Sequence, residues 1–197
     1  MNAFTRWAAR CILLGVLAGG HAADEEKTAS SLRFPSPDGK FAMRIVHDAA
    51  FAGAAEIPTT AIRSIDLVAQ PEQKSAGELM SAEDAQLNFS ELKLLWSADG
   101  QWCAFSYGLP RFAYTLVYRR EGARFRCLAK EGELSAPVKG GIRNQYVTPV
   151  RWVKPGELLL EQETIFTGGQ GEGEGGQITA TYEAKTRKFR IRRVKEK

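Results

Sequence analysis

A turn that occurs twice constrains the fold of this chain more than any other feature of its sequence. The two copies are "FPSPDGKFAMRIV" at 34–46 and "LWSADGQWCAFSY" at 95–107. In each copy the Asp side chain can accept a hydrogen bond from its own backbone, and the following glycine, Gly39 or Gly100, can adopt a positive φ at little cost. An Asp-Gly pair between two apolar runs is a strong hairpin signal, so each copy predicts a strand, a tight turn and a second strand.

A third, weaker copy lies at 149–166, where Pro155-Gly156 replaces Asp-Gly. When the copies are aligned on the glycine, a large apolar residue stands two positions after it in all three: Phe41, Trp102 and Leu158. A tryptophan stands four positions before the glycine in the last two copies, as Trp96 and Trp152. This alignment places Glu161 at the same position as the apolar Phe105, which predicts a half-buried face there.

Each turn is followed by further strand-like segments, such as "FAYTLVY" and "ARFRCL" after the second copy. A unit therefore consists of strand, turn, strand, loop, strand, turn and strand, which is a four-stranded antiparallel meander. We predict an all-β fold with about three such units, at about 30–70, 90–130 and 147–195, in a single domain spanning 23–197. The units either form an open stack or merge into a sandwich or a partly closed barrel.

The two Asp-Gly turns resemble the Ser-Pro-Asp-Gly-Lys turn of TolB-type propeller repeats, in which the turn precedes an apolar strand. The resemblance implies that each unit is one blade of a β-propeller. The three glycines are 61 and 56 residues apart, whereas blade repeats are nearer to about 40–50 residues. Closed propellers have about 4–8 blades, so three units imply an open arrangement with an apolar end, which favours self-association.

The N-terminus has the order of charges, apolar residues and small residues that is typical of a secretory signal peptide. We predict that 1–22 is this signal and that the protein is exported, to the periplasm or the outside of the cell. Its removal deletes Arg6 and Arg10 and leaves 25 basic against 23 acidic residues, a net charge of +2 rather than +4. No later apolar run reaches the roughly 20 residues that span a bilayer.

Three segments are predicted to be loops. Residues 71–88 are polar and rich in small residues, with a short helical turn expected at 82–87, and 130–147 form an irregular second connection. We expect both to add little to the core and to offer binding surface. The glycine-rich stretch 167–177 predicts a hairpin loop; it lacks the lysine of a phosphate-binding loop and carries Glu172 and Glu174, which repel phosphate.

Few residues suit catalysis or metal binding. His47 is the one histidine after residue 22, and its place at a strand end beside Asp48 predicts a surface position. We predict no catalytic site, no metal site and no cofactor. Cys103 and Cys127 fall on the second and fourth strands of one meander, about 9.6 Å apart across the third strand. Because a disulfide needs Cα atoms within about 7 Å, two buried thiols are favoured over a bridge.

The best carboxylate pair is formed by Glu161 and Glu163, which alternation places on one strand face roughly 7 Å apart. That separation would suit an inverting glycoside hydrolase, although a solvated strand face is the more ordinary explanation.

The C-terminal segment "KTRKFRIRRVKEK" is strongly basic. In a strand, Phe189 and Ile191 would point to one side, and the cations would form an exposed face on the other. The predicted binding residues are Lys188, Arg190, Arg192 and Arg193. Such a face can bind an anionic partner, or it can simply keep an edge strand from pairing with other chains.

We therefore predict a non-enzymatic binding or scaffold protein of the bacterial cell envelope. Its expected partner is a protein or an anionic envelope component, neither nucleic acid nor a membrane span. Two alternatives remain open: an envelope polysaccharide hydrolase that uses Glu161 and Glu163, and a structural subunit that forms homo-oligomers through an open end of the stack.

Overall fold

The computed structural model describes residues 27–81, 83–84, 90–168 and 172–194, and it is all-β apart from two short 3-10 helices. The predicted signal peptide and most of the helical turn at 82–87 lie outside the described residues. Unit 1 (28–80) contains β1 (Thr28–Arg33), β2 (Phe41–Asp48), η1 (Ala49–Phe51), η2 (Thr59–Ala61), β3 (Ile62–Ala69) and β4 (Lys74–Met80). Unit 2 (90–129) contains β5 (Ser90–Trp96), β6 (Trp102–Gly108), β7 (Phe112–Glu121) and β8 (Arg124–Ala129). Unit 3 (142–193) contains β9 (Ile142–Lys154), β10 (Glu157–Phe166), β11 (Gly173–Glu183) and β12 (Lys188–Arg193).

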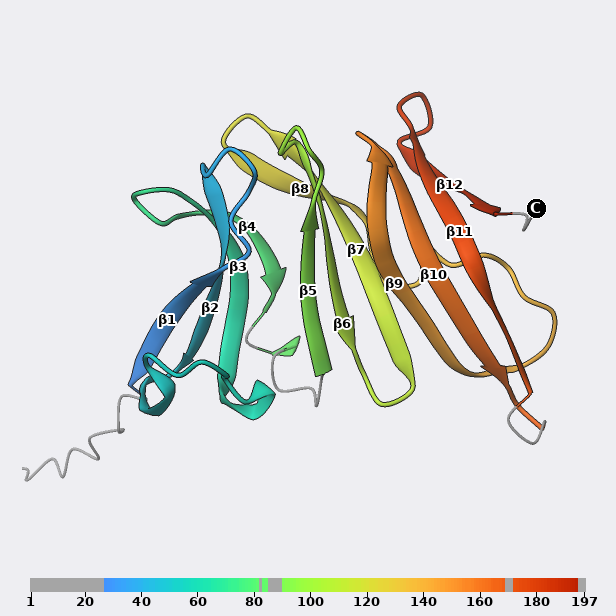
Figure 1. Ribbon diagram of the computed structural model, residues 1–197, viewed down its shortest axis with the longest axis horizontal. Coiled ribbons are helices and arrows are strands. Elements are labelled where there is room, and N and C mark those ends of the chain that lie inside the picture. The colour runs from blue at the N-terminus through green and yellow to red at the C-terminus, as the bar shows by residue number, and fades with distance from the viewer. Residues whose placement is uncertain (1–26, 82, 85–89, 169–171, 195–197) are drawn as a thin grey trace, which may run out of the picture.

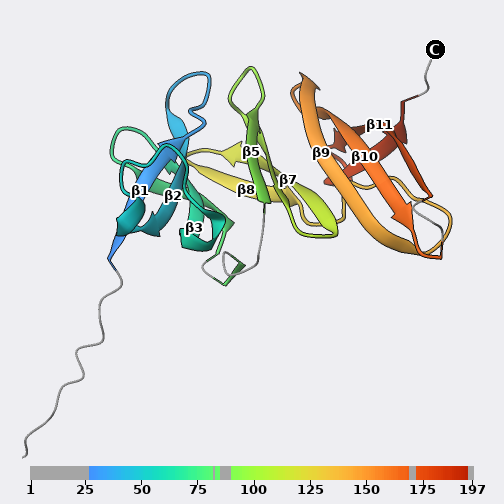
Figure 2. The ribbon, with the colours of Figure 1, turned by 60° about the horizontal axis from the view of Figure 1, so that its bottom comes forward.

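Each unit is a four-stranded antiparallel meander, as the sequence predicted, and the three units follow one another across the molecule (Figures 1 and 2). Unit 1 forms its own sheet in the order β1-β2-β3-β4. Units 2 and 3 share an eight-stranded sheet, because β7 pairs with β8 along one half and, through Phe112 and Ala113, in parallel with β9 at the other end. Neither sheet closes into a barrel.

The two Asp-Gly turns are built alike. In the second, the buried hydroxyl of Ser97 donates to Asp99 Oδ1 and accepts from the backbone N–H of Trp102 at 3.0 Å, while Asp99 Oδ1 also accepts from Gln101 N–H. Gly100 takes φ 64°, a region that costs little only without a Cβ. The first turn repeats every one of these bonds through Ser36, Asp38, Lys40 and Phe41. The bond from Ser36 holds the pKa of Asp38 below its ordinary value, so this carboxylate stays charged to a lower pH than an ordinary aspartate does.

Unit 2 is the middle layer and is buried on both faces. Alternate residues of β6 point to opposite sides, so that Cys103 and Phe105 face unit 1 while Trp102 and Ala104 face unit 3. One core therefore lies between units 1 and 2, and its largest members include Met43, Ile65, Leu67, Phe105 and Tyr118. The second core lies between units 2 and 3 and includes Trp102, Val117, Leu158, Leu160 and Ile178.

The tryptophans before the turns link each unit to the one before it. The indole N–H of Trp96 donates to the backbone oxygen of Phe34 in unit 1, at 2.8 Å. The indole N–H of Trp152 donates to the oxygen of Leu95 in unit 2, at 3.0 Å. Phe34 and Leu95 both stand five positions before the glycine of their own turn, so an equivalent hydrogen bond joins unit 2 to unit 1 and unit 3 to unit 2.

The third turn has one residue fewer between its paired strand residues than the second turn has. This difference exchanges the inward-facing and outward-facing positions of the strand that follows the turn. Trp96 pairs with Cys103, seven residues later, whereas Trp152 pairs with Leu158, six residues later. Leu158 therefore faces the preceding unit, as Cys103 does, and Glu161 faces outward. The predicted match of Glu161 with Phe105 is wrong: Phe105 is fully buried and Glu161 is exposed.

Three predicted loops are partly strand or core. Residues 74–80 form β4, although lysine, serine, alanine, glycine and glutamate favour strands poorly. This segment forms a strand because Ala76, Leu79 and Met80 are buried in the first core. Gly77 allows close packing of β4 against unit 2, since a Cβ at that position would lie 3.1 Å from the backbone oxygen of Phe125. Strand β9 begins at Ile142, β11 begins inside the glycine-rich stretch at Gly173, and the second connection buries Leu134 and Ala136 in the second core.

The outer face of unit 1 is polar rather than apolar. Arg44 forms a bidentate pair with Asp66 on the face opposite Met43, and Arg63 pairs with Asp48 at 2.7 Å. The expectation of an apolar end is therefore not met on this side of the stack.

Candidate functional site

The predicted basic face forms on β12. Phe189 and Ile191 pack against the second core. Lys188, Arg190 and Arg192 alternate with them and are exposed. These three cations lie opposite Glu183, Thr181 and Thr179 of β11. Alternation in a strand, the basis of the prediction, thus holds for every one of these positions.

Two of the four predicted binding residues already have acidic partners within the chain. Arg190 pairs with Glu183 at 3.1 Å. Arg193 pairs with Glu174 and also donates to the backbone oxygen of Pro137 at 3.3 Å. Within the described ranges, Lys188 and Arg192 form no ion pair, so these two side chains are the ones most available to an external anion.

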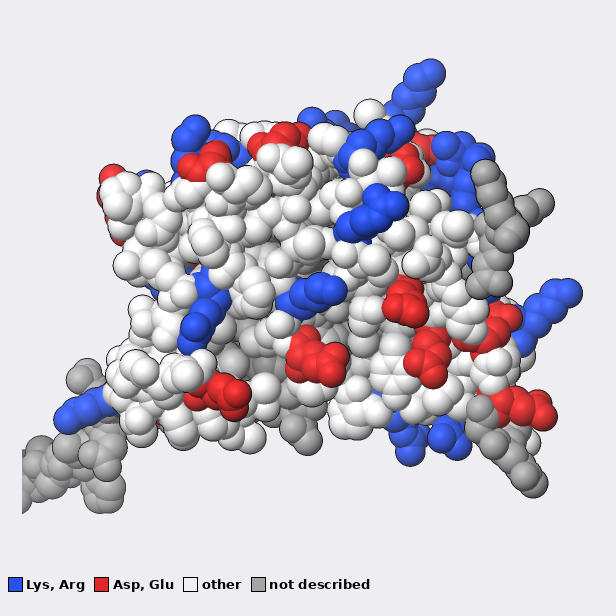
Figure 3. Space-filling model, viewed as in Figure 1, with Lys and Arg blue, Asp and Glu red and all other residues white. Residues whose placement is uncertain are grey.

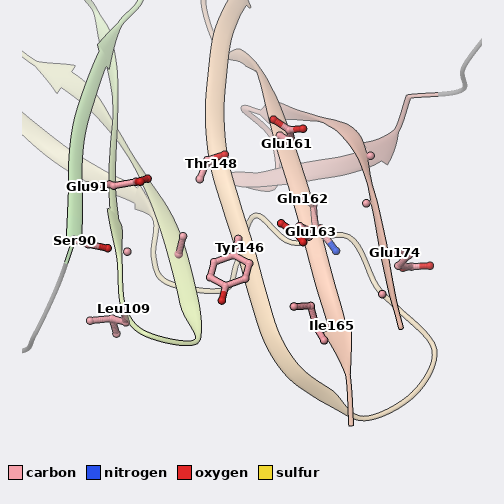
Figure 4. Close-up of a pocket in the computed structure, with 15 residues that line it drawn as sticks. Ser90, Glu91, Leu109, Tyr146, Thr148, Glu161, Gln162, Glu163, Ile165 and Glu174 are labelled. Atoms are coloured by element: carbon pink, nitrogen blue, oxygen red, sulfur yellow. The ribbon is translucent and has the colours of Figure 1, made fainter. Parts of the chain in front are cut away.

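A broad groove of about 970 Å³ lies on the outer face of unit 3 (Figure 4). Glu161 and Glu163 of β10 project into it, Tyr146 of β9 lies beside them, and Glu91 of β5 borders it from unit 2. On the side toward β11, Glu163 is opposite Gly175, which leaves the floor bare of a side chain. Glu174 borders the groove, but it is opposite the buried Thr164, and its carboxylate pairs with Arg193.

The predicted carboxylate pair does share one face, but its placement does not suit glycoside hydrolysis. Glu161 and Glu163 are both exposed and stand two residues apart on one strand, so both would meet a bound sugar from the same side. A hydrolase needs its two carboxyl groups to flank the scissile bond, with the acid in a setting that favours its neutral form.

His47 is buried, which corrects the predicted surface position. Its ring Nε2 lies 3.0 Å from Ser31 Oγ, and its Nδ1 lies 2.9 Å from the backbone oxygen of Asp48. Both ring nitrogens are thus engaged: the Nε2 contact joins β2 to β1, and the Nδ1 contact lies within β2. Within the part of the chain that the structure describes, no group of three or more His, Cys, Asp and Glu side chains is arranged to hold a metal.

The two cysteines are free thiols, as predicted, and Tyr118 of β7 lies between them in the register. Burial raises the pKa of Cys103, which is fully enclosed, and to a lesser extent that of the half-buried Cys127. A raised pKa lowers the fraction of reactive thiolate at neutral pH.

We expect iodoacetamide at pH 8 to alkylate Cys127 slowly and Cys103 only after unfolding in urea, because the thiolate is rare and access is closed. Peptide mapping by mass spectrometry after timed alkylation measures each site. Two cysteines that resist alkylation even in urea without reductant would contradict the strand order, since they would be bridged.

The groove was not foreseen from the sequence beyond the pair Glu161 and Glu163. Tyr146 and Glu91 join it only through the pairing of β9 with β10 and the approach of β5 to β9, which no local pattern encodes. Alternation along β9 was the one signal that could have placed Tyr146 on the outer face.

Comparisons with family models, with curated proteins and with solved structures found no match to this chain. Among the described residues, no helix has the length and apolar character needed to cross a membrane.

Proposed function

We propose that this protein is a non-enzymatic binding module of the bacterial envelope, exported by its N-terminal segment, which recognises an anionic partner through β12. The stack of meanders, which we further propose to be propeller-type repeats, is a rigid frame for that strand. The observation that carries the proposal is the alternation on β12, where buried Phe189 and Ile191 fix the strand and leave Lys188, Arg190 and Arg192 exposed.

The spacing of the cations supports an extended partner with repeated negative charges. Alternate residues of a strand are about 6.8 Å apart, so the three side chains form a line along β12 at the edge of the sheet. Because Phe189 and Ile191 are held in the second core, the line keeps its geometry before binding, which lowers the entropic cost of recognition.

We expect the purified protein to bind both phosphatidylglycerol vesicles and polyglutamate, and a Lys188→Gln, Arg190→Gln, Arg192→Gln variant to bind each at least tenfold more weakly. Near an anionic membrane each basic residue contributes about 1 kcal/mol. Vesicle co-sedimentation and polyglutamate titration separate a lipid surface from an acidic chain as the source of the charge. Equal binding by the variant would place the site elsewhere, and no binding to either anion would contradict the proposal.

The alternative function, hydrolysis of envelope polysaccharide, has one observation in its favour, namely that Glu161, Glu163 and Tyr146 line the same groove. It requires that Glu161→Gln abolish the release of reducing ends from an envelope polysaccharide while the thermal unfolding midpoint is unchanged. We expect instead no release by either form, because the two carboxylates meet a ligand from one side.

A further inference from the structure

The outer face of unit 3 is a sheet face without a partner. Unit 2 is covered by unit 1 on one side and by unit 3 on the other, whereas unit 3 uses only one side in the second core. Its other side carries the outward residues of β9 to β12. In Figure 3 acidic side chains gather over β9–β11, and basic side chains lie above them and at the lower edge.

The register arranges these charges in neighbouring rows across the sheet. One row runs from Arg151 through Leu159 and Thr179 to Arg192. The next two rows along β10, about 7 Å and 14 Å away, hold Glu161 and Glu163. A basic row therefore lies directly beside an acidic pair on one face.

The charges in these rows are not neutralised by the chain itself. Glu161, Glu163, Arg151 and Arg192 are all exposed, and none forms an ion pair with another residue in the described ranges. By contrast, the neighbouring Glu157 is paired with Lys154 at 3.2 Å. The face thus presents two unpaired cations, with the apolar Leu159 between them in the same row, beside two unpaired anions.

We propose that this face binds a second copy of the same chain in a two-fold symmetric dimer. A two-fold axis that lies midway between the two facing sheets, parallel to the rows and passing between the Leu159 and Glu161 rows, places the Arg151 and Arg192 row of each copy opposite the Glu161 row of the other and next to its Glu163 row. The face is complementary to itself because its two halves have opposite signs, which is the requirement for an isologous contact. Two sheets that pack face to face are about 10 Å apart, within reach of arginine and glutamate side chains.

Self-association and anion binding share Arg192. A dimer that covers the outer face of unit 3 would engage this side chain with the glutamates of the other copy. An anionic ligand on β12 therefore competes with the second copy, and dimerisation weakens binding to the anion. The dimer itself is independent of the proposed function, because it depends on Glu161, Glu163 and Arg151 as well.

The test is sedimentation velocity of the full protein over a hundredfold range of concentration, with a charge swap. We expect a reversible dimer in 0.1 M NaCl whose dissociation constant rises at least tenfold in 1 M NaCl, as the screening length falls from about 10 to 3 Å. The Glu161→Lys, Glu163→Lys variant and the Arg151→Glu, Arg192→Glu variant should each dimerise at least tenfold more weakly. Mixed in equal amounts, the two variants should form a heterodimer at least as stable as the wild-type dimer.

The matched control reverses two exposed acids of unit 1, Glu56→Lys and Glu72→Lys, and should dimerise as the wild type does. Formation of a heterodimer in the mixture shows that both variants are folded and that opposite charges meet across the contact. The proposal is overturned if the wild type stays monomeric throughout in 0.1 M NaCl, if either reversed variant dimerises as well as the wild type, or if the mixture does not associate. The vesicle and polyglutamate experiments read out anion binding separately, so either proposal can fail alone.

Discussion

Replacing Trp102 with alanine should lower the free energy of unfolding by about 3–5 kcal/mol, the range for removing a large buried aromatic side chain. Trp102 of unit 2 packs against unit 3, with its ring centroid 5.3 Å from that of Tyr182 and 6.0 Å from that of Trp152. The guanidinium of Arg119 covers it at 5.3 Å. Since single domains are stable by about 5–15 kcal/mol, this loss would remove a large share of the total.

Urea unfolding followed by circular dichroism measures the effect, which avoids a signal that depends on the deleted indole. Trp102→Phe is the matched variant and should recover more than half of the lost stability, because it keeps an aromatic ring against Tyr182. A loss below about 1 kcal/mol for Trp102→Ala, the size expected of a surface change, would contradict the packing of unit 2 on unit 3.

The second large effect is expected at Phe105, a fully buried residue of β6 that faces unit 1. Phe105→Ala should also cost about 3–5 kcal/mol, because the cavity would open in the middle of the first core. Its neighbour on the opposite side of the same strand, Ala104, faces unit 3 instead. Loss of stability at both Trp102 and Phe105 therefore shows that one strand serves two cores.

Differential scanning calorimetry of Phe105→Ala gives the change in unfolding midpoint, with Leu32→Ala as the control. Leu32 is apolar but 40% exposed on β1, so its truncation should change the stability by no more than about 0.5 kcal/mol. Similar effects at Phe105 and Leu32 would mean that unit 1 does not pack on unit 2 as described.

Local chemistry explains what could be predicted from the sequence. The Asp-Gly turns fix their own hydrogen bonds and the conformation of the glycine within a few residues, so both hairpins and the four-stranded units followed from them. The alternation at Phe189, Arg190 and Ile191 is equally local, and Lys188, Arg190 and Arg192 lie on one exposed side as it predicted. Arg193, the fourth predicted binding residue, is opposite the buried Ile178 and so lies on the other side. The separation of Cys103 and Cys127 by one strand followed from counting strands.

The features that were missed depend on contacts between units. The strand at 74–80 exists because Ala76, Leu79 and Met80 are buried against unit 2, which overrides the poor strand preference of its other residues. The outward position of Glu161 depends on a turn that is one residue shorter, and a one-residue shift exchanges the two faces of a strand. Alignment on the glycine alone cannot detect that shift.

The measurement that tests the account most directly is a quantitative pull-down from bacterial envelope extract with three baits: the wild type, the Lys188→Gln, Arg190→Gln, Arg192→Gln variant, and a control that removes three exposed cations of units 1 and 2, Lys74→Gln, Arg124→Gln and Arg126→Gln. The account predicts an anionic component that is enriched by the wild type and the control and is lost with the β12 variant. Equal recovery with all three baits, or the same loss with both variants, would contradict recognition through β12.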